Sequence, residues 1–283
     1  MFYFLKVFVG FFLLFNTVPG CSNTTTEPSG SNIVATSDLD TVSKLVKDAD
    51  KDTLILWDVD QTLITPNDSV LRPKWEQYLD QLLGGKKVMT NELGEKRYIF
   101  REILMKAPHS LINSQSVSLI EELQNMEIPV IAFTAAPGGK IGEIDSFLDW
   151  RIRELEEFGF QFGATFSNVD SIQLPKDPDK EFPPIYKSGV IITSLHEKGP
   201  VLTNFFKEIN WVPKKVIFID DKMSNLESVE QSLKDITQVL GIHYTAANDL
   251  PADLDEEMAK EQVDHFLRTN EWVSQSKLKN LIK

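Results

Sequence analysis

Short apolar runs that end in polar residues are the feature that most constrains the fold of this chain. Each run has four to six residues, lacks helical spacing and is followed at once by an aspartate or a threonine. Runs of this kind are typical of buried strands in a parallel sheet, which is apolar on both faces. The runs are residues 54–57 before Asp58, 128–133 before Thr134 and 216–219 before Asp220. Two further candidate strands are residues 239–242 and 164–166.

Amphipathic helical segments separate the predicted strands. Their apolar residues recur at the three- and four-residue spacing that places them on one helix face. These segments are residues 75–83, 119–126 and 148–158. The alternation of strand, turn and helix predicts an α/β fold with a Rossmann-like, open parallel sheet and right-handed crossovers.

The pattern divides the chain into four parts. The expected parts are a signal peptide (1–20), a flexible tether rich in Ser and Thr (21–37), the α/β core (38–66 and 113–283, with a small insertion at 167–197) and a small, mainly helical cap insertion (67–112). Either insertion could line a binding pocket. Within the cap, Arg72, Lys74 and Arg101 are either substrate contacts or ordinary surface charges.

The N-terminal segment has the composition of a signal peptide. The first twenty residues contain six of the eighteen phenylalanines and a single charged residue, Lys6. The apolar run 7–15 is too short to span a bilayer but has the length of a signal-peptide core. Val18-Pro19-Gly20-Cys21 resembles a bacterial lipoprotein signal, which implies export, lipidation of Cys21 and an anchor in a cell-envelope membrane. An ordinary secretion signal and an uncleaved anchor are the alternatives.

Charge and cysteine content exclude several classes of protein. Acidic residues outnumber basic ones by 42 to 29, and the formal net charge of −13 argues against a general nucleic-acid binder. A small phosphorylated substrate remains compatible if a cation and a few local donors offset this field. Cys21 is the only cysteine, which excludes intrachain disulfides, zinc ribbons and cysteine proteases. The four histidines show no metal-binding spacing, and no feature of the sequence indicates a protein partner.

Four carboxylates are expected to converge at one edge of the sheet. In an open parallel sheet the ligand site lies outside the carboxyl ends of the strands. Asp58 with Asp60, Thr134, and Asp220 with Asp221 stand at those ends. Carboxylates this close together need a counter-charge, because their repulsion would otherwise raise their pKa values or open the site. A hard divalent cation, Mg²⁺ in preference to Ca²⁺, meets that need.

A calcium loop of the EF-hand type is another interpretation of Asp58 and Asp60. Such a loop requires glycine at its sixth position and glutamate at its twelfth. This chain has Leu63 and Ser69 there. We therefore reject the calcium-loop interpretation.

Four motifs occur in order along the predicted core. They are Asp58-Val59-Asp60-Gln61-Thr62-Leu63, Thr134, Lys198-Gly199, and Asp220-Asp221 within residues 217–222. Together they resemble the motifs of the haloacid dehalogenase superfamily, and the resemblance covers nearly all of residues 50–248. Stretches such as Trp150-Arg151-Ile152-Arg153 and residues 225–229 further resemble a poorly characterised bacterial branch, classed as a domain of unknown function. Exported lipoprotein acid phosphatases are a more distant comparison.

The resemblance implies a Mg²⁺-dependent phosphohydrolase that acts on a small phosphorylated substrate through an aspartyl phosphate. Asp58 would be the nucleophile, and Asp60 would act as general acid and base. Thr134, the backbone N–H of Ala135 and Lys198 would hold the phosphoryl group. The expected metal ligands are Asp58, Asp60 (through its backbone carbonyl), Asp220 and Asp221. The alternatives are a phosphotransferase with the same intermediate and a catalytically idle binding lipoprotein.

The lysine of the third motif has a competitor. Lys187 also lies between the second and the fourth motifs, but it precedes Ser188-Gly189, which predicts a hairpin turn. Lys198 instead begins a predicted helix with an apolar face. We therefore expect Lys198 to be the lysine of the site.

Overall fold

The computed structural model describes residues 32–85, 88–90 and 96–281. The predicted signal peptide (1–20) and Cys21 lie outside the described residues, so the expected lipid anchor stays a prediction. Within the described ranges, no helix combines the length and the apolar character that crossing a bilayer requires.

Eight strands of the described chain form one sheet, in which six neighbouring strands are parallel. Across the sheet the order is β1 (Ile33–Thr36), β12 (Gln238–Tyr244), β11 (Lys215–Asp220), β2 (Thr53–Trp57), β7 (Val130–Thr134), β10 (Val190–Ile192), β9 (Ile185–Lys187) and β8 (Ser171–Gln173). The last two strands pair antiparallel. This arrangement confirms the predicted α/β fold with a Rossmann-like parallel sheet.

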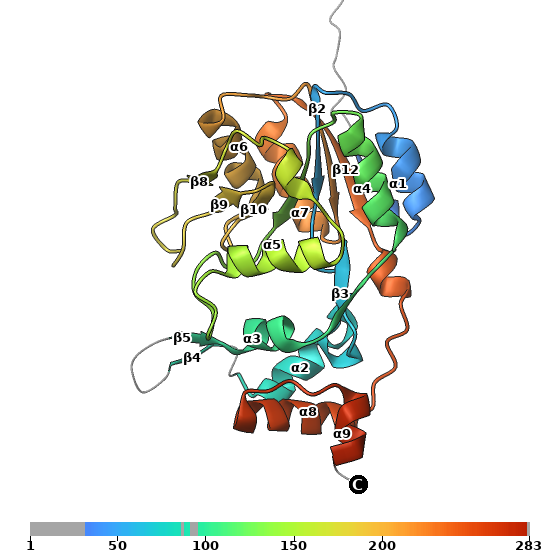
Figure 1. Ribbon diagram of the computed structural model, residues 1–283, viewed down its shortest axis with the longest axis vertical. Coiled ribbons are helices and arrows are strands. Elements are labelled where there is room, and N and C mark those ends of the chain that lie inside the picture. The colour runs from blue at the N-terminus through green and yellow to red at the C-terminus, as the bar shows by residue number, and fades with distance from the viewer. Residues whose placement is uncertain (1–31, 86–87, 91–95, 282–283) are drawn as a thin grey trace, which may run out of the picture. The chain divides into compact units, whose positions relative to one another are not determined.

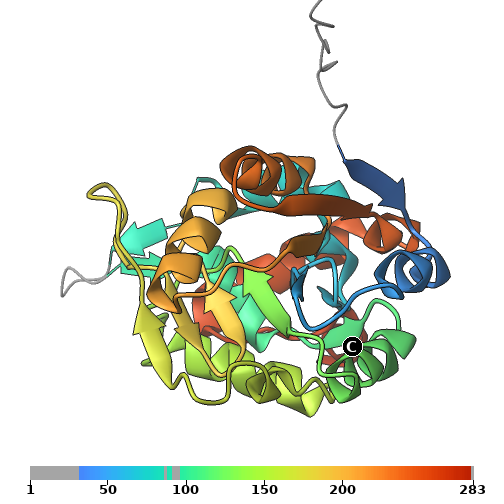
Figure 2. The same ribbon diagram turned by 90° about the horizontal axis from the view of Figure 1, so that it is seen from above.

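Helices cover both faces of the sheet (Figure 2). One face carries α1 (Leu39–Val46), α4 (Gln115–Asn125) and α5 (Phe147–Glu157), and the other carries α6 (Lys198–Glu208) and α7 (Met223–Leu233). The side chains of β2 alternate between the two apolar cores that result. Ile55 and Trp57 pack with the first group of helices, and Leu54 and Leu56 pack with α6 and α7. This period of two decides on which face a residue at the end of the strand lies.

The segment between β2 and α4 forms a second layer at the carboxyl ends of the strands (Figure 1). Two short antiparallel strands, β3 (Ile64–Pro66) and β6 (His109–Leu111), connect the core to this cap layer. The elements between them are η1 (Ser69–Leu71), η2 (Pro73–Trp75), α2 (Glu76–Leu83), β4 (Val88–Thr90), β5 (Lys96–Tyr98) and α3 (Ile99–Lys106).

The C-terminal helices pack on the cap layer, although the sequence analysis placed residues 113–283 in the core. After η4 (Ala246–Asp249), the chain leaves the sheet and forms α8 (Glu256–Thr269) beside α2, and α9 (Gln275–Leu281) packs against α8 (Figure 1). The apolar stripe of α8 is buried against apolar side chains of α2 and α3. The members of this stripe are Ala259, Val263 and Phe266. Burial of these groups at helical spacing is the physical reason for the difference.

Three short segments also differ from the sequence analysis. Residues 33–36, expected in the tether, form β1 and pair with β12 at the edge of the sheet. Residues 162–164 form a 3₁₀ turn, η3 (Phe162–Ala164), where a strand at 164–166 was expected. The expected insertion at 167–197 contains β10, which pairs with β7 and is fully buried, so this strand belongs to the core.

Candidate active site

Asp58 and Asp220 lie side by side because their strands are neighbours in parallel register. The backbone N–H of Asp58 donates to the carbonyl oxygen of Ile219 at 2.9 Å, which continues the β2–β11 ladder by one residue. Along both strands, alternation puts the two aspartates on the face that α6 and α7 cover. The sheet alone therefore brings two buried carboxylates together.

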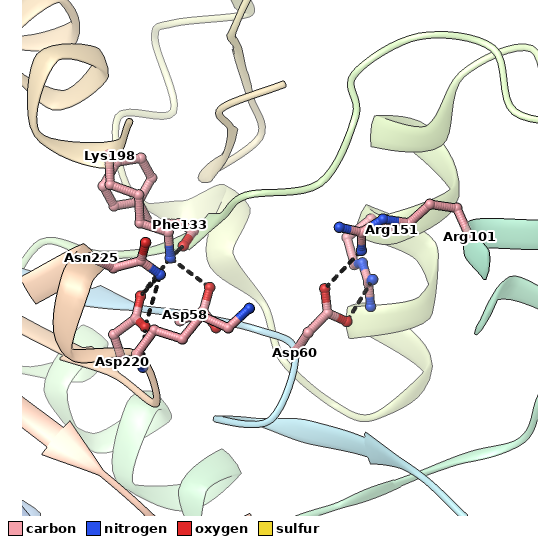
Figure 3. Close-up of polar contacts among 9 residues, drawn as sticks. Asp58, Asp60, Arg101, Phe133, Arg151, Lys198, Asp220 and Asn225 are labelled. Atoms are coloured by element: carbon pink, nitrogen blue, oxygen red, sulfur yellow. Dashed lines mark hydrogen bonds and ion pairs between the residues drawn. The ribbon is translucent and has the colours of Figure 1, made fainter. Parts of the chain in front are cut away.

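The ammonium group of Lys198 bridges these two carboxylates (Figure 3). Its Nζ donates to Oδ1 of Asp58 at 2.6 Å, to Oδ2 of Asp220 at 2.7 Å and to the carbonyl oxygen of Phe133 at 2.6 Å. Lys198 is the first residue of α6 and only 1% exposed. Burial alone would lower the pKa of Lys198, but Asp220 and Asp58 raise it above its ordinary value. The buried lysine is therefore a stable cation.

Asp220 is fixed by further donors from the turn that follows β11. The backbone N–H of Lys222 donates to Oδ1 at 2.8 Å, and Nδ2 of Asn225 lies 3.0 Å from each carboxylate oxygen. Asp220 is completely buried, so these donors replace the water that it loses. The sequence analysis did not single out Asn225. Its position in the first turn of α7 is a signal for such a role, because that turn returns toward the end of β11.

Three carboxylates of the described chain form a group that could hold a metal ion. One oxygen from each of Asp58, Asp220 and Asp221 can be chosen so that all three atoms lie within 4.8 Å of one another. Burial raises the pKa of Asp58 well above its ordinary value, and the charges of Asp220 and Asp221 raise it further against the opposing effect of Lys198. Burial and the charge of Asp220 likewise raise the pKa of Asp221 to about 6. Three carboxylates thus share a single ammonium group. Their oxygen donors suit a hard divalent cation such as Mg²⁺.

The carboxylate of Asp60 lies in a different cluster from the other three, which the sequence analysis had expected to converge with it (Figure 3). Oδ1 of Asp60 accepts from Nη2 of Arg151 at 2.8 Å, and Oδ2 lies 3.8 Å from Nη1 of Arg101. The chain has left β2 and turns through Gln61 at a φ of 67°, so strand alternation no longer fixes the direction of this carboxylate, and its guanidinium partners decide it. The predicted metal contact of its backbone carbonyl stays a prediction.

The guanidinium groups set the charge state of Asp60. Burial alone would raise the pKa of Asp60, but Arg151 and Arg101 lower it below its ordinary value. Asp60 is therefore held as a carboxylate at neutral pH in this arrangement.

Arg151 belongs to a buried network that the sequence analysis did not recognise. Its side chain is 1% exposed, and Nη1 donates to Oε2 of Glu154 at 2.5 Å. On its other side, Oε1 of Glu154 lies 3.3 Å from Nδ1 of His109. Helical spacing offered a signal for this burial, because Arg151 lies three residues after Leu148 and four before Leu155 on the buried stripe of α5. An arginine at such a position needs buried partners.

The three basic residues proposed for the cap have different surroundings. Arg101 is 22% exposed in its side chain and contacts Asp60, so it is not an ordinary surface charge. Arg72 donates through Nε to the carbonyl oxygen of Pro66 at 3.2 Å and through Nη1 to that of Pro251. Lys74 is exposed, with its Nζ 5.3 Å from the ring centroid of Trp75.

A cavity of about 140 Å³ lies between the core groups and the cap layer. Its core side includes Thr134 and Ala135, the two residues expected to hold a phosphoryl group, together with Asp58, Asp60 and Asp221. Neither Lys198 nor Asp220 is among the lining residues, since both are buried, and Lys198 contacts the lining residue Asp58. The geometry thus brings Asp58, Thr134 and Asp221 to one cavity, with Lys198 and Asp220 buried beneath it.

Lys187, the competing lysine, lies elsewhere. Its side chain is 42% exposed, and its Nζ contacts Oδ1 of Asp149 at 2.7 Å. Ser188 and Gly189 have φ values of 47° and 75° between the antiparallel strands β9 and β10, which confirms the predicted hairpin turn. The structure places Lys198, and not Lys187, beside Asp58.

The sequence profile of a family described as "Protein of unknown function (DUF2608)" matches residues 35–279. The chain is 27% identical over 249 residues to "Uncharacterized protein RP296" of Rickettsia prowazekii (strain Madrid E), covering 86% of this chain and 88% of that protein. It is 24% identical over 176 residues to an uncharacterized protein of Rickettsia felis, covering 60% of this chain and 54% of that protein. Neither name assigns an activity.

One solved structure is similar to this chain at low level. It is the "Phospho-Aspartyl Intermediate Analogue of Phosphoserine phosphatase", with 16% sequence identity and a TM-score of 0.33. The similarity covers 67% of this chain and 92% of that chain.

Proposed function

The chain belongs to the DUF2608 family, and we propose from the site itself that this member is a Mg²⁺-dependent phosphohydrolase of the haloacid dehalogenase type. The observation that carries the proposal is the cluster of Asp58, Lys198, Asp220 and Asp221 at the base of the cavity. A buried lysine that bridges two carboxylates, with a third beside them, is costly to fold. Such a cluster is typical of sites where charge is used for catalysis.

Mg²⁺ fits the donor set, because three carboxylates within 4.8 Å are only partly neutralised by one ammonium group. Asp58, Asp220 and Asp221 would hold the ion. When bound, the ion supplies positive charge that offsets the charge on the phosphoryl oxygens.

In the first half of the reaction, Asp58 attacks the phosphorus atom. Its Oδ1 accepts a hydrogen bond from Lys198, so Oδ2 is the atom available for attack. A bond forms between this oxygen and phosphorus as the bond from phosphorus to the leaving oxygen breaks, and the protonated form of Asp60 gives its proton to that oxygen. Arg151 and Arg101 make this form the minor one at neutral pH, so this half of the reaction slows as Asp60 ionises. Thr134 and the N–H of Ala135 would hold the phosphoryl oxygens during the transfer.

In the second half, water attacks the phosphorus atom of the aspartyl phosphate and the bond to Asp58 breaks. Asp60 accepts the proton of the water, which restores the acid for the next turnover. Arg151 and Arg101 favour this step, because they hold Asp60 as a carboxylate that can accept a proton.

The metal requirement is the direct test. We expect the purified protein to hydrolyse simple phosphomonoesters only with Mg²⁺, and Mg²⁺ at one hundred times its dissociation constant to stabilise the fold by about 2.7 kcal/mol. Asp220→Asn should lose both effects, since it removes a predicted ligand. Asp149→Asn, which changes an exposed carboxylate paired with Lys187, should lose neither. Absence of both metal binding and hydrolysis in the wild-type protein would instead favour the idle binding protein.

The pH dependence of the reaction tests the part assigned to Arg151. Removing its charge in Arg151→Met should raise the pKa of Asp60, because a cation that stabilises the carboxylate is lost. The basic limb of the plot of kcat/KM against pH, where Asp60 loses the proton that it gives to the leaving oxygen, should therefore move to higher pH. Arg151→Lys keeps the charge and should fall between that variant and the wild type. Arg153→Met, an exposed position on the same helix, is the control and should keep the wild-type profile. An unchanged profile in Arg151→Met would show that the pH dependence of kcat/KM does not come from Asp60.

A further inference from the structure

The size of the cavity restricts what the proposed phosphohydrolase can accept. Its volume of about 140 Å³ is small. Pockets for drug-sized ligands measure roughly 300–1,000 Å³, and an engineered apolar cavity of about 150 Å³ in another protein holds one benzene molecule. The phosphoryl group must lie at the carboxylate end, so little space remains for the leaving group.

The cap supplies an apolar wall opposite the carboxylates. Four apolar side chains from η1, α2 and α3 line this side of the cavity. They are Leu71, Leu79, Phe100 and Leu104. Leu71, Leu79 and Leu104 are buried in the apolar core of the cap, and Phe100 packs against that core while it remains partly exposed. A hydroxyl, ammonium or carboxylate group placed against this wall would lose water without gaining a partner.

The charged side chains on the cap side do not favour a second anionic group on the substrate. Arg72 is engaged with two backbone carbonyl groups, and Arg101 faces Asp60. Glu76 also lines the cavity and adds negative charge. Lys222 is a lining residue too, but it follows Asp221 on the core side, where the phosphoryl group would lie.

We propose that the natural substrate is the phosphomonoester of a small, largely apolar alcohol, whose carbon chain contacts Leu79, Phe100 and Leu104. Hydrolysis of this ester rests on the proposed function, whereas binding of this class of ligand does not. Sugar phosphates, nucleotides and phosphorylated amino acids fit the cavity less well, because they are larger or carry polar groups toward the apolar wall.

Binding of non-hydrolysable phosphonates separates the ligand class from turnover. Pentylphosphonate has the shape of butyl phosphate, and 2-amino-4-phosphonobutanoate has the shape of phosphoserine, with a methylene group replacing the ester oxygen in each. By calorimetry with Mg²⁺ present, we expect pentylphosphonate to bind at least about tenfold more tightly than 2-amino-4-phosphonobutanoate. The reason is that even a single methylene group in an apolar pocket changes the preference between two ligands by roughly 10–200-fold. Equal or tighter binding of the amino-acid analogue would overturn the proposal.

Substitutions at the wall test whether these side chains cause the preference. Phe100→Gln should reduce the ratio of the two affinities, while Phe100→Leu, which keeps the site apolar, should preserve most of it. Met126→Gln makes a similar apolar-to-polar change at an exposed position on the C-terminal side of α4, outside the cavity, and should leave the ratio unchanged. A ratio that does not respond to Phe100→Gln would show that the wall does not select the ligand.

Turnover assays distinguish the failure of this inference from failure of the proposed function. Tighter binding of pentylphosphonate without hydrolysis of butyl phosphate supports the ligand class and contradicts the hydrolase. If phosphoserine is hydrolysed at a higher kcat/KM than butyl phosphate, and 2-amino-4-phosphonobutanoate also binds more tightly than pentylphosphonate, the hydrolase is supported and the proposed ligand class is overturned.

Discussion

Asp58→Asn is expected to abolish phosphomonoester hydrolysis while the protein remains folded. The amide cannot act as the nucleophile, and loss of a nucleophile costs about 10⁴-fold or more in turnover. The fold should tolerate the change, because asparagine has nearly the same shape and Lys198 keeps Asp220 and the carbonyl oxygen of Phe133 as acceptors. Steady-state kinetics measures the first effect, and thermal unfolding measures the second.

A covalent readout makes this prediction specific. Rapid acid quench of the wild-type reaction should yield a phosphorylated peptide that contains residue 58, and the variant should yield none. Asp52→Asn is a matched control, because Asp52 immediately precedes the opposite end of β2 and pairs with the exposed Lys214. It should keep the wild-type rate. If Asp58→Asn retained substantial turnover, the mechanism through an aspartyl phosphate at residue 58 would be wrong.

Lys198→Met is expected to destabilise the protein more than any surface substitution. The change leaves the buried carboxylates of Asp58 and Asp220 without their shared cation, and breaking a buried ion pair from one side costs about 3–5 kcal/mol. Without the opposing charge of Lys198, the carboxyl group of Asp58 should take up a proton in the folded state at a higher pH than in the unfolded state. The free energy of unfolding of the variant should therefore fall as the pH rises above the ordinary carboxyl pKa of about 4. Denaturant unfolding at several pH values measures this dependence.

Two comparisons separate this effect from a general loss of packing. Lys187→Met removes an exposed ion pair with Asp149 and should cost less than about 1 kcal/mol. The double variant Lys198→Met with Asp58→Asn should be more stable than Lys198→Met alone, because one of the unpaired charges is removed. Mg²⁺ should also restore part of the lost stability. Equal effects of the substitutions at Lys187 and Lys198 would contradict the proposed charge balance.

Much of the fold followed from local patterns in the chain. The apolar runs before Asp58, Thr134 and Asp220 became neighbouring parallel strands, since a short run that is apolar on both faces can be buried only inside such a sheet. Alternation along those strands is also local, and it explains why Asp58 and Asp220 share a face. The patterns did not reveal where the C-terminal helices pack, because an apolar stripe shows that a helix is buried but not against what.

Sequence alone determined which groups stand at the carboxyl end of the sheet. It identified Asp58, Thr134, Asp220 and Asp221 as neighbours of one site, because register and chain order leave strand ends little freedom. Lys198 was expected there from the resemblance of the motifs and from the helix that it begins. Only the tertiary structure decided the direction of the carboxylate of Asp60, which depends on guanidinium groups from α3 and α5. The physical reason is that a side chain beyond a strand is oriented by its strongest electrostatic partners, and packing of distant helices determines where those partners lie.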